Sequence, residues 1–141
     1  MKTKEVVDLL EVSQDTLRYY EKVGVIPPVK RDSNGYREYQ NNDLNWIYLV
    51  KNLRRAGVGI ESLIEFCRLA QLPKDEYIKN QQKEILQNQL EELNEQLDLI
   101  LNARNLLQYK IDNYDNHIAK IDAGEVDNEN VERLWEKTLN K

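Results

Sequence analysis

The sequence predicts a mostly helical protein, in which a winged helix-turn-helix domain is followed by a long coiled-coil dimerisation helix and a short C-terminal helix. Two short amphipathic segments lie close together near the start of the chain. The Asn34-Gly35 pair that follows them is a strong hairpin signal. An apolar heptad pattern then extends from Leu86 to Ile121. We expect the three parts to occupy residues 1–72, 73–122 and 123–141.

Length and charge limit the classes of function that the chain can have. Its 141 residues fit one small domain plus an extended element, and no motif of a hydrolytic or nucleotide-binding enzyme occurs. We therefore expect no enzymatic activity. The formal charge of -5 is uneven: residues 1–70 have 11 basic and 10 acidic side chains, whereas residues 71–141 have 9 and 15. An anion-binding surface is expected in the first half.

Cysteine, histidine and hydropathy limit the site chemistry and the compartment. Cys67 and His117 are single in the sequence, so no internal disulfide and no metal site of several thiols or imidazoles is expected. No cofactor is indicated. No apolar run approaches the ~20 residues that span a membrane, and the first residues lack the apolar core of a secretory signal. These features favour a cytoplasmic protein with no membrane partner.

The first two predicted helices form the helix-turn-helix. Apolar side chains between residues 3 and 12 recur at helical spacing, which predicts one short helix. Ser13 is suited to cap a second helix, and Gly24 is suited to end it in a left-handed conformation. The turn between the two helices falls at residues 11–13.

A wing is predicted after the second helix. Pro27-Pro28 excludes a helix there, and Asn34-Gly35 predicts a type I′ turn between residues 29–31 and residues 36–39. We expect these two segments to pair as short strands.

Two more helices should complete the domain. Asn41, Asn42 or Asp43 is expected to cap the third helix, and Gly57 is expected to end it. A fourth helix is predicted at about residues 60–70, before Pro73 interrupts the chain.

The heptad pattern predicts the longest element. Its positions alternate steps of four and three residues and are Leu, Ile or Tyr except at Arg104, which is a candidate for fixing register or antiparallel orientation. No other part of so short a chain can cover this stripe, so we expect a homodimer. The predicted dimerisation residues are Leu90, Leu93, Leu97, Ile100, Leu107, Ile111, Tyr114 and Ile118.

A short amphipathic helix is predicted after a turn at Gly124. We expect it to pack on the coil or on the partner copy. The residues of its packed face are predicted to be Val131, Leu134, Trp135 and Thr138 or Leu139.

Basic and hydrogen-bonding residues of the first half point to double-stranded DNA. Residues 14–55 contain eight basic and five acidic side chains, a local excess that suits phosphate contacts. In a recognition helix Gln suits adenine and Arg suits guanine, while Tyr hydroxyls and further Arg side chains reach phosphate. The candidate DNA-binding residues are Gln14, Thr16, Arg18 and Tyr19 of the second helix, Tyr36 and Arg37 of the wing, and Arg54 of the third helix.

Several motifs add a family resemblance over roughly residues 3–70. They are Glu5-Val6, Val12-Ser13, Thr16-Leu17-Arg18-Tyr19-Tyr20-Glu21, Gly24, Pro27-Pro28, Arg31, Gly35-Tyr36-Arg37-Glu38-Tyr39, Asp43-Leu44 and Leu53-Arg54-Arg55-Ala56-Gly57. Together they resemble the MerR family of transcriptional regulators. The resemblance implies an antiparallel dimer bound to a pseudo-palindromic promoter element. An effector-linked change in the dimer would distort this element so that RNA polymerase can engage the promoter. The regulator would thus act on RNA polymerase indirectly, through the promoter.

The chain departs from the family pattern at three places: Thr3-Lys4 replaces a common Ile-Gly pair, Glu11 replaces a turn Gly, and Gly59 replaces a capping Ser or Thr. It also lacks the paired cysteines of thiol metal sensors in residues 112–130, so no such metal site is expected.

Two residues are candidates for contact with an unidentified effector. Cys67 is one because some small family members sense electrophiles through a single cysteine, although a small buried hydrophobe is the simpler interpretation. Trp135 is the other, as part of a site for a small apolar ligand between the tail and the coil.

Two alternative functions stay open at this point. One is a coiled-coil interaction protein with a vestigial helix-turn-helix, which would show no salt-dependent DNA binding. The other is an excisionase-like architectural DNA-binding protein, which the long seam disfavours.

Overall fold

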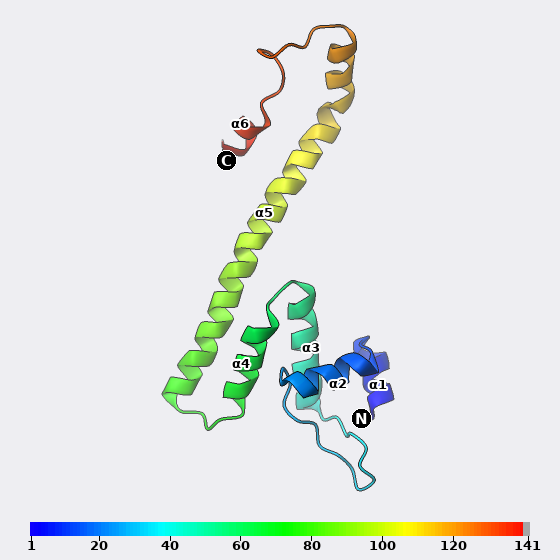
Figure 1. Cartoon of the computed structure of the whole chain (residues 1–141), viewed down its shortest axis with the longest axis vertical. Helices are drawn as coiled ribbons and strands as arrows, with labels where there is room; N and C mark the ends of the chain where they lie inside the picture. The colour runs from blue at the N-terminus through cyan, green and yellow to red at the C-terminus, as the bar shows by residue number, and fades with distance from the viewer. Residues whose placement is uncertain (140–141) are drawn as a thin grey trace. The chain divides into compact units, whose positions relative to one another are not determined.

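The computed structural model describes the backbone of residues 1–139 and the side chains of residues 1–136. The side chains of Thr138 and Leu139, predicted on the tail helix, therefore lie outside the described residues. Its helices are α1 (Thr3–Leu10), α2 (Gln14–Val23), α3 (Asn41–Arg55), α4 (Ile60–Ala70), α5 (Glu76–Asp122) and α6 (Leu134–Leu139) (Figure 1). The chain divides into two compact units, the helix-turn-helix unit of residues 1–93 and a second unit from Asn94 onward.

The turn between α1 and α2 follows the sequence prediction. The Thr16 N–H donates to Ser13 Oγ at 3.0 Å, which satisfies one open donor at the start of α2. Gly24 ends that helix with a φ of 82°. Glu11 stands at the end of α1 with a φ of 54°, a left-handed conformation in which a side chain is unfavourable.

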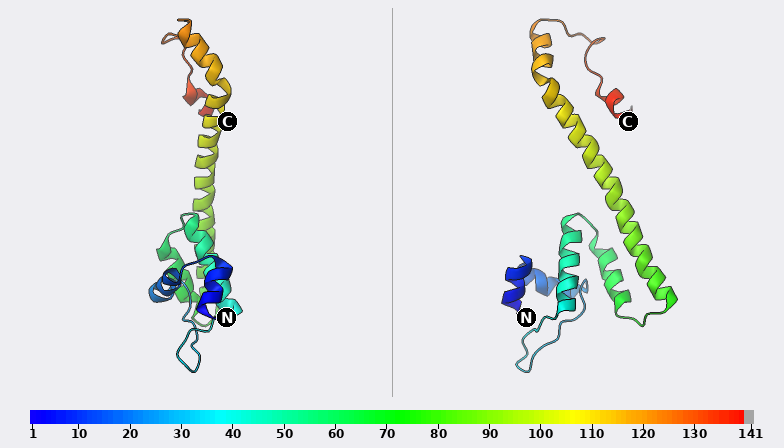
Figure 2. Two further views of the ribbon diagram at one scale, coloured as in Figure 1. Left: turned by 90° about the vertical axis from the view of Figure 1, so that its right-hand side faces the viewer. Right: turned by 180° about the vertical axis from the view of Figure 1, so that it is seen from behind.

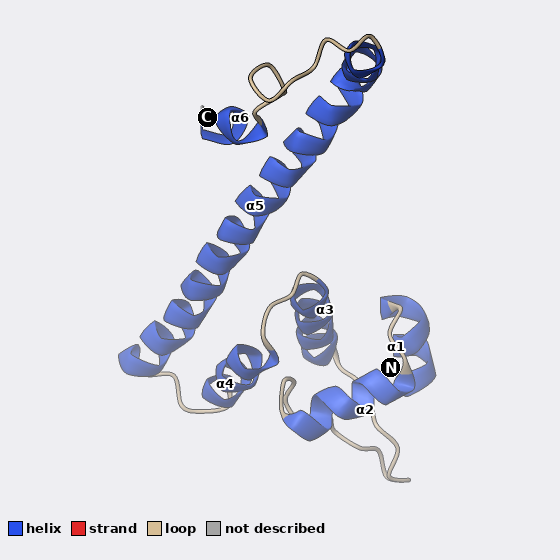
Figure 3. Ribbon diagram, turned by 45° about the horizontal axis from the view of Figure 1, so that its top comes forward, coloured by secondary structure: helices blue, strands red, loops and turns tan. Residues whose placement is uncertain are grey.

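The wing, residues 29–39, differs from the predicted hairpin. The described residues contain no strand, and one isolated bridge pairs Arg31 with Arg37 (Figure 3). The type I′ prediction is wrong because that turn needs a positive φ at both central residues, whereas here Gly35 has one, at 84°, and Asn34 does not. Asp32 stabilises the turn of the wing instead, since its Oδ1 accepts the N–H groups of Asn34 and Tyr36 at 2.9 and 3.0 Å.

The N-cap of the third helix lies one residue before the earliest of its predicted caps. Gln40 is the N-cap of α3, and its N–H donates to the Asp43 carboxylate at 2.8 Å. Asp43 thus closes the cap from three residues inside the helix. The predicted end of this helix is confirmed, because α3 stops at Arg55 and Gly57 follows with a φ of 94°.

One apolar core holds the helix-turn-helix unit together, and each of α1 to α4 contributes to it. Trp46 of α3 and Phe66 of α4 add an aromatic contact with ring centroids 5.6 Å apart. The fully assembled core consists of Val6, Val12, Leu17, Tyr20, Val25, Ile26, Val29, Tyr39, Ile47, Val50, Val58 and Leu63.

A helical hairpin joins α4 to the first turns of α5 (Figure 2). The Gln82 amide donates to the Phe66 carbonyl at 3.4 Å, and the Gln89 amide donates to Ser62 Oγ at 3.0 Å. Asp75 caps α5, as its carboxylate accepts the Ile78 N–H at 2.8 Å.

In the second unit, the segment after α5 folds back on the helix through an ion pair between Lys110 and Glu132. A turn built on Asp127 precedes it, with the N–H groups of Glu129 and Asn130 donating to its carboxylate at 2.8 and 3.0 Å. The tail helix is shorter than predicted, because α6 begins at Leu134 and leaves Val131 in the preceding turn.

None of the helices in residues 1–139 is both long and apolar enough to cross a membrane.

The seam of α5 is largely exposed to solvent. Leu93 is an exception within the seam, since it packs against the core of the helix-turn-helix unit. Side chains exposed by between 46% and 69% occur at Leu86, Leu90, Leu97, Ile100, Leu107, Ile111, Tyr114 and Ile121.

Candidate nucleic-acid interface

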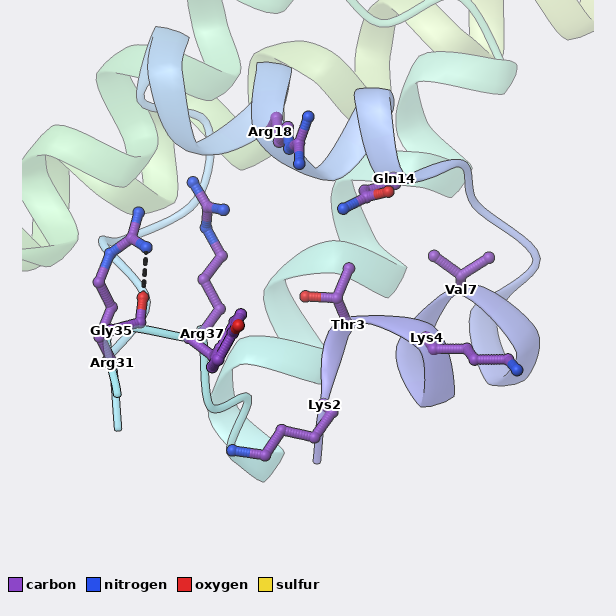
Figure 4. A pocket seen from close by; sticks show the side chains of 10 residues that line it. Lys2, Thr3, Lys4, Val7, Gln14, Arg18, Arg31, Gly35 and Arg37 are labelled. Atoms are coloured by element: carbon purple, nitrogen blue, oxygen red, sulfur yellow. Dashed lines mark hydrogen bonds between the residues drawn. The ribbon is translucent and has the colours of Figure 1, made fainter. Parts of the chain in front are cut away.

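Helix α2 presents its polar face between two hollows on the helix-turn-helix unit. The larger, here called the basic hollow, has a volume of about 820 Å³ and lies between α2, the start of α1 and the wing (Figure 4). Gln14 and Arg18 project into it from α2, opposite Lys2 and Arg37. Its lining residues are Lys2, Thr3, Lys4, Val7, Gln14, Arg18, Arg31, Gly35, Tyr36 and Arg37.

A second hollow, of about 450 Å³, lies on the other side of α2. It brings Thr16 of α2 next to the basic end of α3, where Lys51, Arg54 and Arg55 line it. Basic groups therefore flank α2 on both sides, an arrangement suited to a duplex whose two phosphate backbones border one groove.

Four of the seven predicted DNA-binding residues meet in the basic hollow: Gln14, Arg18, Tyr36 and Arg37. Thr16 and Arg54 lie in the second hollow instead. Tyr19 lines neither, although 49% of its surface is exposed on α2.

The two arginines of α2 and the wing differ in how they are held. Arg18 is exposed and has no hydrogen-bond or ion-pair partner among the described residues, so its guanidinium is free for a ligand. Arg37 is half-buried, and its Nε lies 3.3 Å from the Glu21 carboxylate, which also accepts the Val29 N–H. Arg37 thereby joins the wing to α2 and keeps its terminal nitrogens toward the hollow.

Three basic residues of α3 line the second hollow, and the side chains of two of them donate hydrogen bonds to carbonyls at or just past the end of a helix. Arg54 Nη1 donates to the Val58 carbonyl at 2.9 Å, past the end of α3. Lys51 Nζ donates to the Leu10 carbonyl at 2.6 Å, at the end of α1. These bonds place positive charge at helix C-termini and hold both side chains in place.

Sequence reasoning missed three basic residues of the basic hollow: Lys2, Lys4 and Arg31. A signal existed for Arg31, because it belongs to the basic segment of residues 14–55 and to the motifs that carry the family resemblance. None existed for Lys2, which reaches the wing only through the tertiary fold and forms ion pairs with Asp32 and Glu38.

The ion pairs of Lys2 shift several titrations. The hydrogen bond from Lys2 lowers the pKa of the Asp32 carboxyl and that of Glu38, and the two carboxylates raise the pKa of Lys2. Burial raises the pKa of Tyr20, which stays a neutral hydroxyl beside Arg54. Lys2 and its two carboxylate partners therefore stay charged near neutral pH.

The two effector candidates lie in contrasting surroundings. Cys67 is fully buried in α4, and desolvation raises the pKa of its thiol, which opposes the thiolate that reactivity needs. Trp135 has 58% of its surface exposed, with the Arg133 guanidinium 5.3 Å from its ring. A polar hollow of about 170 Å³ in the second unit is lined by residues such as His117 and Lys120 and does not include Trp135.

The fold and this surface define a winged helix-turn-helix protein, and comparisons identify its family. Residues 1–69 match the model of the MerR HTH family regulatory proteins. A crystal structure of a Listeria monocytogenes protein assigned to the MerR family of transcriptional regulators is 37% identical, with a TM-score of 0.79 over 88% of this chain and 92% of that one. The chain belongs to the MerR family.

Two further comparisons bear on DNA binding. The transcriptional regulator AdhR of Bacillus subtilis is 46% identical over 69 residues, which is 49% of each protein, so the match spans about half of that relative's length. The structure of HiNmlR, a MerR family regulator lacking the sensor domain and bound to promoter DNA, is 27% identical. It has a TM-score of 0.72 and covers 84% of this chain and 92% of that chain.

Proposed function

We propose that the protein is a promoter-binding transcriptional regulator that acts in the cytoplasm as a homodimer and has no catalytic role. The observation that supports this most directly is that basic side chains line both the basic hollow and the second hollow, on either side of α2, in a chain whose formal charge is -5. Gln14 and Arg18 project into the basic hollow, where a recognition helix would meet base edges, and Arg18 has no partner among the described residues. Tyr36, exposed at the tip of the wing, is suited to a phosphate.

The open seam of α5 supports the dimer. Eight large side chains of the α5 seam are about half exposed or more, and a second copy is the cover that matches their heptad spacing. An antiparallel pairing of the seams would join two helix-turn-helix units in one dimer. Two recognition helices related by a two-fold axis would then bind a pseudo-palindromic element.

Distortion of that element is the proposed route to RNA polymerase, which the dimer would affect only through the shape of the promoter. The effector would be either a small molecule that binds without forming a covalent bond or an electrophile that reacts with Cys67. Burial of Cys67 favours the first, and a Cys67→Ser variant with a full transcriptional response would exclude thiol sensing.

Fluorescence anisotropy with DNA from the region upstream of the protein's own gene tests the proposal. The full chain should prefer a duplex with a two-fold symmetric element over a shuffled duplex, and its affinity should fall steeply with KCl. Arg18→Ala should cost ~1–3 kcal/mol and relax sequence preference, because the side chain would contact a base edge. Arg68→Ala, which removes an exposed cation on α4, is the matched control and should change little.

The same measurements separate the alternatives. A scaffold protein would show no salt-dependent binding and no effect of Arg18→Ala. An excisionase-like protein would bind and bend DNA but change no reporter promoter. Specific binding together with an altered reporter supports the regulator.

A further inference from the structure

The N-terminal residues are hydrogen-bonded to the return segment of the wing. The Tyr39 N–H donates to the Met1 carbonyl at 2.7 Å, and the Met1 nitrogen donates back to the Tyr39 carbonyl at 2.8 Å. The return segment of the wing is therefore fixed beside the start of α1.

Lys2 extends the connection to the tip of the wing. Its Nζ lies 2.6 Å from Asp32 Oδ2 and 2.5 Å from Glu38 Oε2, so one ammonium bridges the outgoing and returning segments. The other Asp32 oxygen accepts the N–H groups of Asn34 and Tyr36, which shape the turn. The wing has one isolated bridge and backbone hydrogen bonds from Asp32 to Tyr36 and from Glu38 to Lys30, and the Lys2 ion pairs add side-chain contacts that hold it in position.

We propose that Lys2 is a positioning residue of the DNA interface: it holds the wing, with Arg31 and Tyr36, in place beside α2 and is not itself a phosphate ligand. This inference rests on the proposed function. Its basis is that both carboxylates already engage the Lys2 ammonium, although Lys2 lines the basic hollow. Neighbouring Lys4 lines the same hollow without a hydrogen-bond or ion-pair partner among the described residues.

Hydrogen exchange on the DNA-free full chain gives the first test. Lys2→Met should speed exchange of the wing amides of Asp32, Glu38 and Tyr39 by about two- to tenfold, since it removes two ion pairs. Lys2→Arg should restore slow exchange. Lys4→Met is the matched control and should leave these amides unchanged. Unchanged wing exchange in Lys2→Met would overturn the proposal.

The second test removes the carboxylates and keeps Lys2. In the Asp32→Asn/Glu38→Gln variant, the amide oxygen at position 32 can still accept the two turn N–H groups. The variant gains positive charge in the hollow, so a simple electrostatic model predicts tighter DNA binding. The positioning role predicts faster wing exchange and about three- to tenfold weaker binding to the symmetric duplex, a range typical of one or two lost ion pairs.

The salt dependence completes the test. Lys4→Met should lower the slope of log affinity against log KCl by about one phosphate contact, whereas Lys2→Met should lower affinity with the slope retained. A reduced slope in Lys2→Met, or tighter binding by Asp32→Asn/Glu38→Gln, would show that Lys2 is a phosphate ligand instead. If the wild-type chain bound no duplex, the proposed function would fail, while hydrogen exchange would still decide the positioning role.

Discussion

The helix-turn-helix unit and the rod of α5 bury their apolar residues in different ways. In the first unit, side chains from α1 to α4 close around Leu17 and Ile47, whose exposed fractions are 1% and 0%. Along α5 no residue is fully buried, and Ile100 has 64% of its surface exposed. The core that α1 to α4 form is closed within one chain, whereas the apolar seam of α5 is left without a cover.

This difference separates two kinds of stability. Residues that fill the core of the first unit should affect folding at any protein concentration. Residues of the seam should affect association, and therefore any property that depends on two linked recognition helices. Substitutions in the core should therefore change folding stability, and substitutions in the seam should change dimer association.

The largest effect is expected from Ile100→Asp in the seam. Each copy would lose ~1.5–3 kcal/mol of apolar burial, so the dissociation constant of the dimer should rise by about two to four orders of magnitude. Sedimentation velocity from nanomolar to micromolar protein measures this change. Leu99→Asp is the control, because Leu99 is 71% exposed and lies outside the seam. A wild-type chain that stays single at micromolar concentration would contradict the comparison.

Ile47→Ala should have the next largest effect, on folding. It leaves a cavity in a fully buried site of α3 and should lower the free energy of unfolding by ~2–5 kcal/mol. Urea titration followed by circular dichroism, at one fixed protein concentration, measures it. Tyr48→Ala on the same helix should cost less than ~1 kcal/mol, since Tyr48 is 62% exposed. Equal losses for the two variants would show that the first unit has no closed core.

The sequence predicted these two regions with different completeness. Helical spacing and caps located α1, α2 and α4, because local hydrogen bonds and apolar periodicity decide such elements. The wing was mispredicted, since Asp32 stabilises a different turn from the one that Asn34-Gly35 favours in isolation. The candidate DNA-binding residues were proposed from motif and charge and remain predictions, whereas the proposed role of Lys2 depends on contacts with residues 30 and 36 positions away.

A smaller effect is expected at Cys67, which tests how closed the first unit is. Because the thiol is fully buried and burial raises its pKa, iodoacetamide should label the native chain at pH 8 at least about tenfold more slowly than the urea-unfolded chain. Mass spectrometry of timed samples gives both rates. Native labelling as fast as unfolded labelling would instead support the electrophile-sensing role of this cysteine.

Glu11→Gly should give the smallest effect and the opposite sign. Glu11 ends α1 with a φ of 54°, a conformation that costs a residue with a Cβ ~1–2 kcal/mol and glycine almost nothing. Part of that gain is offset by the greater freedom of glycine in the unfolded chain, so a net stabilisation of ~0.5–1 kcal/mol is expected. Asp8→Gly, inside α1, should instead destabilise by a similar amount. Thermal unfolding at fixed concentration compares the two, and a lower Tm for Glu11→Gly would mean that Glu11 makes a stabilising interaction in the turn that exceeds its backbone cost.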